Sequence, residues 1–185
     1  MTEDSVRIRV ADEGDVEAVL ALEREVPEAP HWHRGEYAAI FAGEIAPGAV
    51  RRRLFLAESE IGLLGFSVGA VWGSRSGGDF HAMDGEVRRG GWGVLESVAV
   101  RGSARRLGVG RALCVAVLAW CGAEGARRVE LEVRSASAGA VALYRQLGFE
   151  VTGRRAAYYI APPDEALLME ARLGGVDEGR SGTGE

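Results

Sequence analysis

The stretch Leu95-Glu96-Ser97-Val98-Ala99-Val100 decides the fold, together with Arg105-Arg106-Leu107-Gly108-Val109-Gly110-Arg111 a short loop later. Apolar and β-branched residues on both faces of the first stretch predict a buried strand. Apolar residues then recur at helical spacing and predict a helix from about Gly108: Leu113, Ala116, Val117, Trp120 and Cys121. Glycines at a helix start leave backbone N–H groups open, and the helix dipole adds partial positive charge. The second stretch is therefore a candidate anion site.

Two other nucleotide-binding loops do not fit this segment. A Walker A loop requires a lysine, and the chain has none, because all 22 of its Lys and Arg residues are Arg. A dinucleotide fingerprint requires a third glycine where Leu113 stands, and it requires glycines directly after the strand. The remaining pattern, Arg-x-x-Gly-x-Gly at Arg105, Gly108 and Gly110, resembles the acetyl-CoA pyrophosphate loop of the GNAT acyltransferase superfamily. An ordinary helix start capped by glycine would show the same residues.

Length and composition indicate one globular domain without a membrane or nucleic-acid partner. The 185 residues are enough for one core, and 47% hydrophobic with 26% charged residues is ordinary for a globular protein. A net charge of −5 argues against general binding to nucleic acid or anionic membranes. Cys114 and Cys121 fall on the apolar side of the central helix, as small core residues do in a reducing compartment. No leader pattern opens the chain, so a cytoplasmic protein is expected.

The remaining elements follow from periodicity and turn residues. Helices are expected after Asp12, around Tyr37, from Gly108 and after Ser137. Strands are expected over 6–10, 54–58, 63–72, 95–100, 128–133, 151–160 and 166–173. The order β-α-α-β-β-β-α-β-α-β-β predicts one α/β domain over residues 1–173, with a mixed, largely antiparallel central sheet flanked by helices. This order resembles that of the GNAT fold.

Three further segments lie outside these elements. Arg51-Arg52-Arg53 indicates a solvated turn. Residues 73–93 form a glycine-rich loop, for which two roles are open: an insertion without function, or a cover over the acceptor carrying Asp79, Phe80, His81, Asp84 and Glu86. Residues 174–185 are rich in glycine and acids and predict a disordered tail.

The second half is similar to one branch of the superfamily, the ribosomal-protein-alanine N-acetyltransferases. The matching residues are Leu131-Glu132-Val133-Arg134, Ala140-Val141-Ala142-Leu143-Tyr144, Leu147-Gly148-Phe149, Arg154-Arg155, Tyr158-Tyr159, Pro163 and Glu165-Ala166. The resemblance covers most of residues 6–173. It implies acetyl-CoA as cosubstrate and a protein or peptide N-terminus as acceptor, for example that of a ribosomal protein. Two positions depart from the family: Ser137 stands where Asn is usual, and Arg101-Gly102 replaces a proline-containing turn.

The resemblance assigns roles to single residues. It implies Glu132 as general base, Tyr144 as general acid toward the departing thiolate, and backbone N–H groups around Val98 and Val100 as donors to the thioester and pantetheine. Glu96 is the rival base, because an acid on a central strand is otherwise hard to place. From the residues alone, a carboxylate in the position of Glu132 is most often solvated, and the Tyr144 ring also fits the core, in one stripe with Leu143 and Leu147. The implied cofactor-binding set is Val98, Ala99, Val100, Arg105, Arg106, Leu107, Gly108, Val109, Gly110, Arg111, Ser137 and Tyr144.

Acetyl transfer from a thioester needs no enzyme nucleophile. It needs a deprotonated amine, donors for the oxyanion and a proton for the thiolate. An α-amino group has a pKa of about 7.8 and lysine about 10.4, a difference of roughly 3.5 kcal/mol, so an N-terminal amine is the easier acceptor. A small-amine acetyltransferase and a silent acetyl-CoA-binding module remain alternatives. No metal is expected, since His31 and His33 lack a nearby third ligand, and the oligomeric state stays open.

Overall fold

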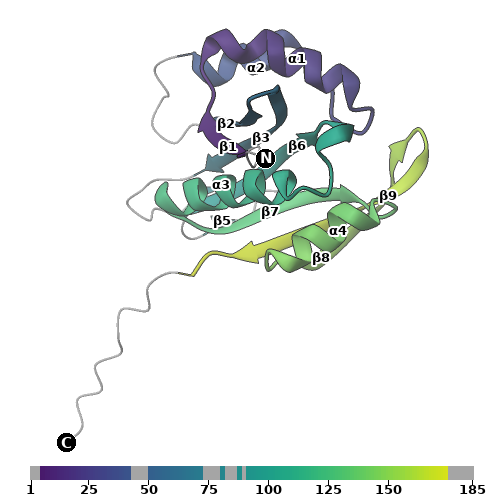
Figure 1. Ribbon diagram of the computed structural model, residues 1–185. Coiled ribbons are helices and arrows are strands. Elements are labelled where there is room, and N and C mark those ends of the chain that lie inside the picture. The colour runs from purple at the N-terminus through teal and green to yellow at the C-terminus, as the bar shows by residue number, and fades with distance from the viewer. Residues whose placement is uncertain (1–4, 43–49, 73–79, 82–86, 89–90, 175–185) are drawn as a thin grey trace, which may run out of the picture.

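The computed structural model describes residues 5–42, 50–72, 80–81, 87–88 and 91–174. Seven strands form one sheet in the order β1-β2-β3-β6-β7-β9-β8 (Figure 1). Their bounds are β1 Arg7–Val10, β2 Arg51–Ser59, β3 Gly62–Trp72, β6 Gly91–Val100, β7 Ala126–Arg134, β8 Glu150–Ile160 and β9 Pro163–Arg172. The helices are α1 Val16–Glu25, α2 Arg34–Phe41, α3 Val109–Ala123 and α4 Ala138–Gln146. Short 3₁₀ turns span Glu13–Asp15 and Gly102–Ala104.

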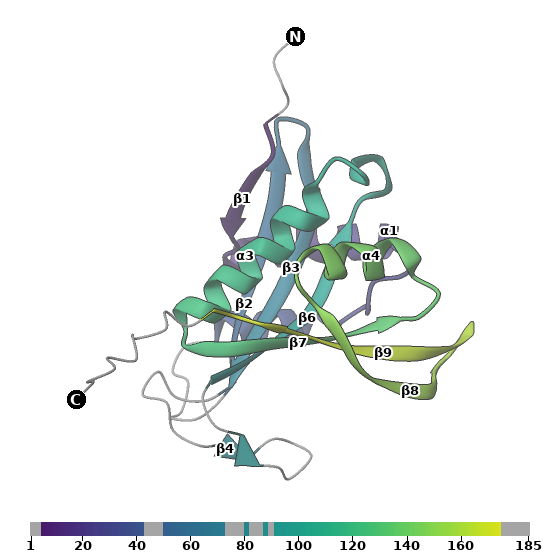
Figure 2. The ribbon, with the colours of Figure 1, turned by 90° about the horizontal axis from the view of Figure 1, so that it is seen from below.

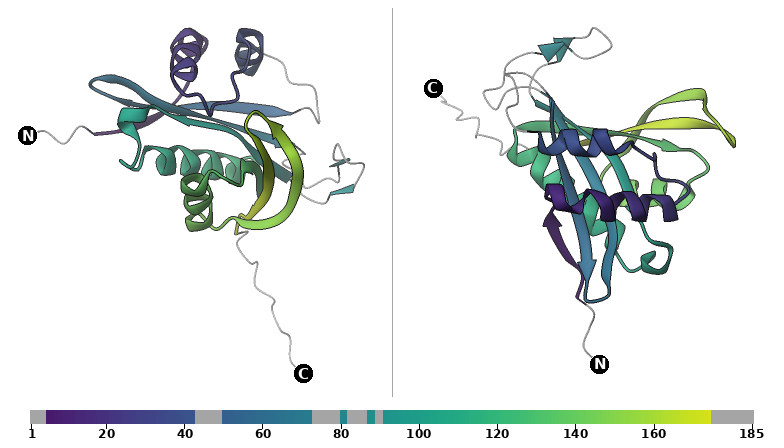
Figure 3. Two further views of the ribbon diagram at one scale, coloured as in Figure 1. Left: turned by 90° about the vertical axis from the view of Figure 1, so that its right-hand side faces the viewer. Right: turned by 90° about the horizontal axis from the view of Figure 1, so that it is seen from above.

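Helices cover both faces of the sheet. α1 and α2 lie on one face and α3 and α4 on the other, as Figure 3 shows. Two apolar cores result, one under α1 and α2 around Tyr37 and Phe66, and one under α3 around Leu113 and Met169. Because both of its faces are covered, β3 is buried almost continuously from Leu64 to Val71. None of the described helices is long and apolar enough to cross a membrane.

The sheet opens between β6 and β7, the one parallel pair of the described main sheet. The two strands pair only from Gly91 to Val94 of β6, and the last partners are Val94 and Glu130. On its other side β6 carries a β-bulge: Leu95 is opposite Gly69 and Ser97 is opposite Val68, so Glu96 is the extra residue. A bulge bends a strand and increases its twist. Beyond it β6 and β7 run apart, as Figure 2 shows, and residues 95–100 have no partner on β7.

The predicted fold class and order of the main elements are confirmed, with two differences. β6 begins at Gly91, inside the predicted loop, and a separate two-stranded ladder joins β4 (Phe80–His81) to β5 (Val87–Arg88). The predicted turn at Arg51–Arg53 is wrong, because these residues extend β2 by pairing with Val71, Ala70 and Gly69 of β3. Residues 73–79, 82–86 and 89–90 of the predicted loop, with Asp79, Asp84 and Glu86, lie outside the described residues. So do residues 175–185 of the predicted tail.

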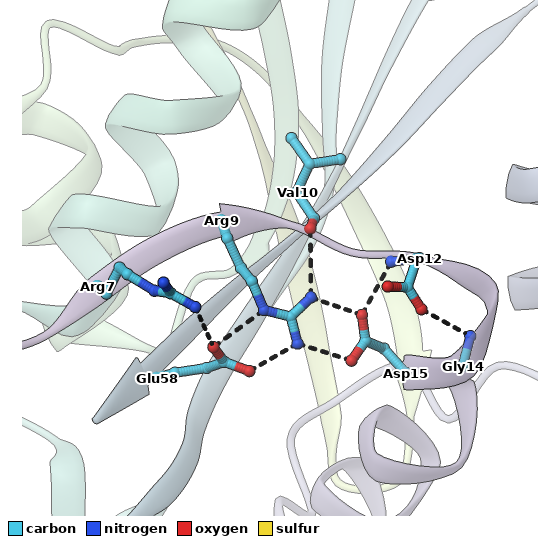
Figure 4. A network of polar contacts seen from close by, with 7 residues as sticks. All are labelled: Arg7, Arg9, Val10, Asp12, Gly14, Asp15 and Glu58. Atoms are coloured by element: carbon cyan, nitrogen blue, oxygen red, sulfur yellow. Dashed lines mark hydrogen bonds and ion pairs between the residues drawn. The ribbon is translucent and has the colours of Figure 1, made fainter. Parts of the chain in front are cut away.

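A network centred on Arg9 joins the first strand to the start of α1 (Figure 4). The Arg9 guanidinium donates to both carboxylate oxygens of Asp15, each at 2.7 Å, and to Glu58 on β2 at 2.6 and 2.9 Å. Asp15 also accepts from the backbone N–H of Asp12, whose own carboxylate caps Gly14. Arg9 holds the pKa values of Asp15 and Glu58 below their usual range. β1 and the start of α1 are thereby held together.

Replacing Arg9 by methionine removes this network while keeping an apolar stem. We expect Arg9→Met to lower the free energy of unfolding by about 1–2 kcal/mol at pH 7, measured by urea denaturation. Because the carboxylate pKa values are lowered in the folded state, the stabilisation is complete above their ordinary values of 3.8 and 4.5. It disappears as the pH falls through the lowered values.

Arg7→Met is the matched control, because Arg7 is largely exposed and reaches Glu58 only at 3.5 Å. Its effect should be within about 0.5 kcal/mol. An Arg9→Met loss that stays constant down to pH 2 would contradict the assignment of the stabilisation to the two carboxylates.

Candidate active site

The start of α3 presents free backbone N–H groups. The first helical donor at this end is the N–H of Ala112, which reaches the carbonyl of Gly108 at 3.0 Å. The N–H groups of Val109, Gly110 and Arg111 come before it and have no intrahelical acceptor. Gly108 has φ +81°, and nothing lies within 4 Å of where its Cβ would be. No acidic residue occupies the first turn, so this end of α3 fits a phosphate.

The arginines of this loop have different surroundings. Arg105 pairs with Glu28 at 3.0 Å, and Arg101 pairs with Glu25 at 3.1 Å, so both tie the loop to the end of α1. Arg105 lowers the pKa of Glu28. The side chains of Arg106, Leu107 and Arg111 are exposed around the helix start, which places two cationic groups at the mouth of the phosphate site: Arg106 and Arg111.

The open edge of β6 continues from this loop. The N–H of Arg101 donates to the carbonyl of Leu64 on β3 at 2.8 Å. Because successive backbone groups of a strand point to opposite edges, the N–H groups of Val98 and Val100 then point away from β3, toward the gap beside β7. Ala99 points its backbone groups to β3 and its side chain into the core under α1. The N–H groups of Val98 and Val100 therefore have no strand partner on the side that faces the gap.

The two candidate bases lie on the same face of the sheet, at the two sides of the gap. Glu132 belongs to the face opposite Leu131 and Val133, which pack in the α3 core. Each carboxylate belongs to the second residue beyond the last β6–β7 partners, Val94 and Glu130. Glu96 pairs with Arg52 of β2. Leu54, two residues further along β2 and on the same face as Arg52, packs under α1 and α2.

Both carboxylates are held by arginine. The Arg52 guanidinium donates to the two oxygens of Glu96 at 2.8, 2.9 and 3.2 Å, and the Glu96 side chain is 14% exposed. Arg155 of β8 donates to Glu132 at 2.5 Å, and the Glu132 side chain is 32% exposed. Tyr158 also hydrogen-bonds to Glu132, which raises the pKa of its hydroxyl. Glu132 is thus the more accessible of the two carboxylates.

Tyr144 lies on the other side of the sheet, on α4. Its ring packs edge-on against Phe149 with 5.8 Å between centroids. Burial raises the pKa of its hydroxyl above the ordinary value, with smaller contributions from Cys114 and Tyr159. α4 adjoins the phosphate loop, because a Cβ on Gly110 would lie 3.6 Å from Leu143 and from Val100. Ser137 is the N-cap residue of α4, and its side chain makes no capping hydrogen bond.

Sequence reasoning missed the partners of the two bases. Arg52 was assigned to a turn, and nothing local in the sequence links it to Glu96, 44 positions away. Arg155 and Glu132 meet only because β8 and β7 flank β9. His33 has a structural position as the N-cap of α2, where its N–H donates to Glu36 at 2.7 Å. Cys114 and Cys121 are buried free thiols. Among the described residues no group of metal-ligating side chains occurs.

Comparison with known proteins identifies the class. The model of the acetyltransferase (GNAT) family matches residues 17–149, and the chain belongs to this family. It is 32% identical over 176 residues to an N-alpha-acetyltransferase of Sulfurisphaera tokodaii, covering 90% of this chain and 93% of that protein. It is also 43% identical over 75 residues to an uncharacterized protein of Mycobacterium leprae, but this match spans only 20% of that protein.

Solved structures share the fold. The ribosomal-protein-S18-alanine N-acetyltransferase of Escherichia coli superimposes with a TM-score of 0.68 at 23% identity, covering 94% of this chain and 98% of the other. Arabidopsis thaliana NAA60, solved in complex with acetyl-CoA, gives a TM-score of 0.72 at 16% identity over 92% and 100% of the two chains. As a member of the acetyltransferase (GNAT) family, whose acyl donor is acetyl-CoA, the chain is an acyltransferase.

Changing Gly110 tests whether the start of α3 holds the pyrophosphate. We expect Gly110→Asp to weaken acetyl-CoA binding at least tenfold, about 1.4 kcal/mol, because it adds negative charge beside the free N–H groups. Gly110→Ala is the control, since a Cβ there makes only ordinary contacts at 3.6 Å. Titration calorimetry measures both. Equal affinity of the aspartate and alanine variants would contradict the assignment.

Proposed function

We propose that this protein transfers the acetyl group of acetyl-CoA to the α-amino group of a protein or peptide N-terminus, such as that of a ribosomal protein. The observation that carries the proposal is the parting of β6 and β7, with the phosphate loop and Tyr144 on one side of the sheet and two carboxylates on the other. The names of the relatives from Sulfurisphaera tokodaii and Escherichia coli support this acceptor class. A cytoplasmic location remains a prediction from the sequence.

The donor would lie along β6 and the start of α3. Val109, Gly110 and Arg111 offer N–H groups to the pyrophosphate, with Arg106 and Arg111 as nearby cations. Val98 and Val100 offer N–H groups to the pantetheine and to the thioester carbonyl, where they stabilise the oxyanion as charge develops. The Ser137 hydroxyl, at the start of α4, is a shorter donor than the asparagine it replaces. Acetyl-CoA supplies an acyl group that is already activated as a thioester.

The acceptor would approach from the α1–α2 face. Glu132 is the proposed base, because it is the more exposed carboxylate and stands at the edge of the gap. The cationic guanidinium of Arg155 pairs with the Glu132 carboxylate. The ammonium group of an arriving acceptor is also a cation, and it is a chemically similar partner for the same carboxylate. Glu132 removes a proton from this group, which leaves the neutral amine that attack requires. Glu96, enclosed by Arg52, remains the alternative base.

Tyr144 is the proposed acid on the opposite side. Like a tyrosine of ordinary pKa, it carries its proton throughout the neutral range, so a proton is available to the departing thiolate. The neighbouring Leu143 lies beside Gly110 of the phosphate loop, which supports a role for Tyr144 on the donor side. The proposed base and the proposed acid are thus separated by the thickness of the sheet.

A panel of acceptors tests the proposed function. Purified protein with acetyl-CoA is assayed against peptides with free N-termini, the same peptides with blocked N-termini and an internal lysine, and small amines such as polyamines and amino acids. We expect turnover of the free N-termini, with kcat/KM at least tenfold above the other two groups. Preferential acetylation of small amines or of lysine would overturn the proposed acceptor class.

Three variants connect this activity to the site. Tyr144→Phe keeps the ring and its packing, and it should lower turnover by roughly 10²-fold while acetyl-CoA affinity holds. Glu132→Gln and Glu96→Gln form a matched pair, since each carboxylate is held by one arginine. Glu132→Gln should lose the larger share of activity and change the pH profile. Loss of activity in the Glu96→Gln variant alone would identify Glu96, on β6, as the general base.

A further inference from the structure

The Ser97 hydroxyl is buried without a partner. Ser97 is 6% exposed, and its Oγ makes no hydrogen bond within the described part of the chain. A hydroxyl group removed from water without compensation destabilises the folded state. The neighbouring strand offers a contrast, because Ser67, which is also buried, donates its hydroxyl to the carbonyl of Leu113 at 3.3 Å. Packing of the sheet therefore does not by itself prevent a buried serine from being paired.

The bulge explains where this hydroxyl lies. Ser97 is directly opposite Val68, and cross-strand partners share a face, so the Ser97 side chain lies on the α1–α2 face with Val68. Glu96, the extra residue of the bulge, reaches Arg52 on that same face. Two consecutive residues thus present a carboxylate and a hydroxyl together, whereas a regular strand would send them to opposite faces.

This position adjoins the gap in the sheet. Ser97 falls within residues 95–100, the part of β6 that has lost β7 as a neighbour. Glu132 belongs to β7, on the other side of the point where the strands part, and lies on the same face of the sheet. A ligand bound beside this part of β6 would supply the hydrogen bond that the Ser97 hydroxyl lacks.

We propose that the Ser97 hydroxyl binds the acceptor amine and orients it for attack. This inference rests on the proposed N-acetyltransferase function. The hydroxyl oxygen accepts a hydrogen bond from an N–H of the neutral amine, and so leaves the nitrogen lone pair free to point at the acyl carbon. Ser97 and Glu132 then contact the amino group from β6 and β7, the two sides of the opening. Ser97 binds and orients, while the proton goes to the carboxylate.

The test compares Ser97→Ala with Ser67→Ala, two deletions of a buried hydroxyl from adjacent strands. Thermal unfolding and steady-state kinetics with a free N-terminal peptide are measured on both. For Ser97→Ala we expect kcat/KM for the acceptor to fall about tenfold, an unchanged KM for acetyl-CoA, and a melting temperature equal to or above that of the wild type. For Ser67→Ala we expect the reverse: a lower melting temperature and unchanged kcat/KM.

Two results would overturn the inference. One is a wild-type kcat/KM in Ser97→Ala, and the other is a loss of melting temperature as large as that of Ser67→Ala, which would reveal a structural partner. If Ser97→Ala does not fold, the near-isosteric Ser97→Cys takes its place in both measurements. Failure of the proposed function is a separate outcome, because the wild type would then acetylate no N-terminal peptide, while the comparison of melting temperatures still decides whether the Ser97 hydroxyl lacks a partner.

Discussion

One extra residue in β6 is the constraint on which the rest of the structure depends. β6 pairs with β3 on one side over most of its length, and the insertion of Glu96 shifts that register by one position. Pairing with β7 ends at Val94, two residues earlier. Beyond Val94 the two strands part, and the peptide groups of Val98 and Val100 on that side have no strand partner.

Arginine–glutamate pairs hold the surroundings of the β6–β7 gap in place. Arg52 fixes Glu96, Arg155 fixes Glu132, and Arg105 fastens the phosphate loop to Glu28. Exposed pairs of this kind contribute little to stability, typically less than about 1 kcal/mol each. Their effect here is on position: they hold the carboxylates at the two edges of the gap. The buried, unpaired hydroxyl of Ser97 departs from the general pairing of buried polar groups, and such departures concentrate at functional sites.

The fold was largely predictable, because its signals are local. Signals within a few residues indicate each element: the left-handed Gly108 and the apolar spacing for α3, and the apolar alternation for β7. The start of β6 was misplaced because Gly91, Trp92 and Gly93 show no strand alternation. The small size of Gly91 and Gly93 is required instead by close neighbours, since a Cβ at Gly91 would lie 2.5 Å from the carbonyl oxygen of Gly125.

The site was less predictable, because its partners are brought together by pairing across the sheet. The sequence alone pointed to Glu96, Glu132 and Tyr144, largely through family resemblance. It did not reveal that Arg52 lies within reach of Glu96, since the register of β2 and β3 decides whether Arg51–Arg53 is a turn or a strand. A β-bulge also has no strong sequence signature. Only the three-dimensional structure therefore shows that the Ser97 hydroxyl lacks a hydrogen-bond partner.

The central claim is that the open edge of β6 and the start of α3 together receive acetyl-CoA. Residue-resolved amide hydrogen exchange by NMR, with and without saturating acetyl-CoA, tests it most directly. The N–H groups of Val98, Val100, Val109, Gly110 and Arg111 should become protected, while those of the distant β1 stay unchanged. Saturation of the protein with acetyl-CoA without protection at Val98 and Val100 would contradict the claim that the gap in the sheet is the donor site.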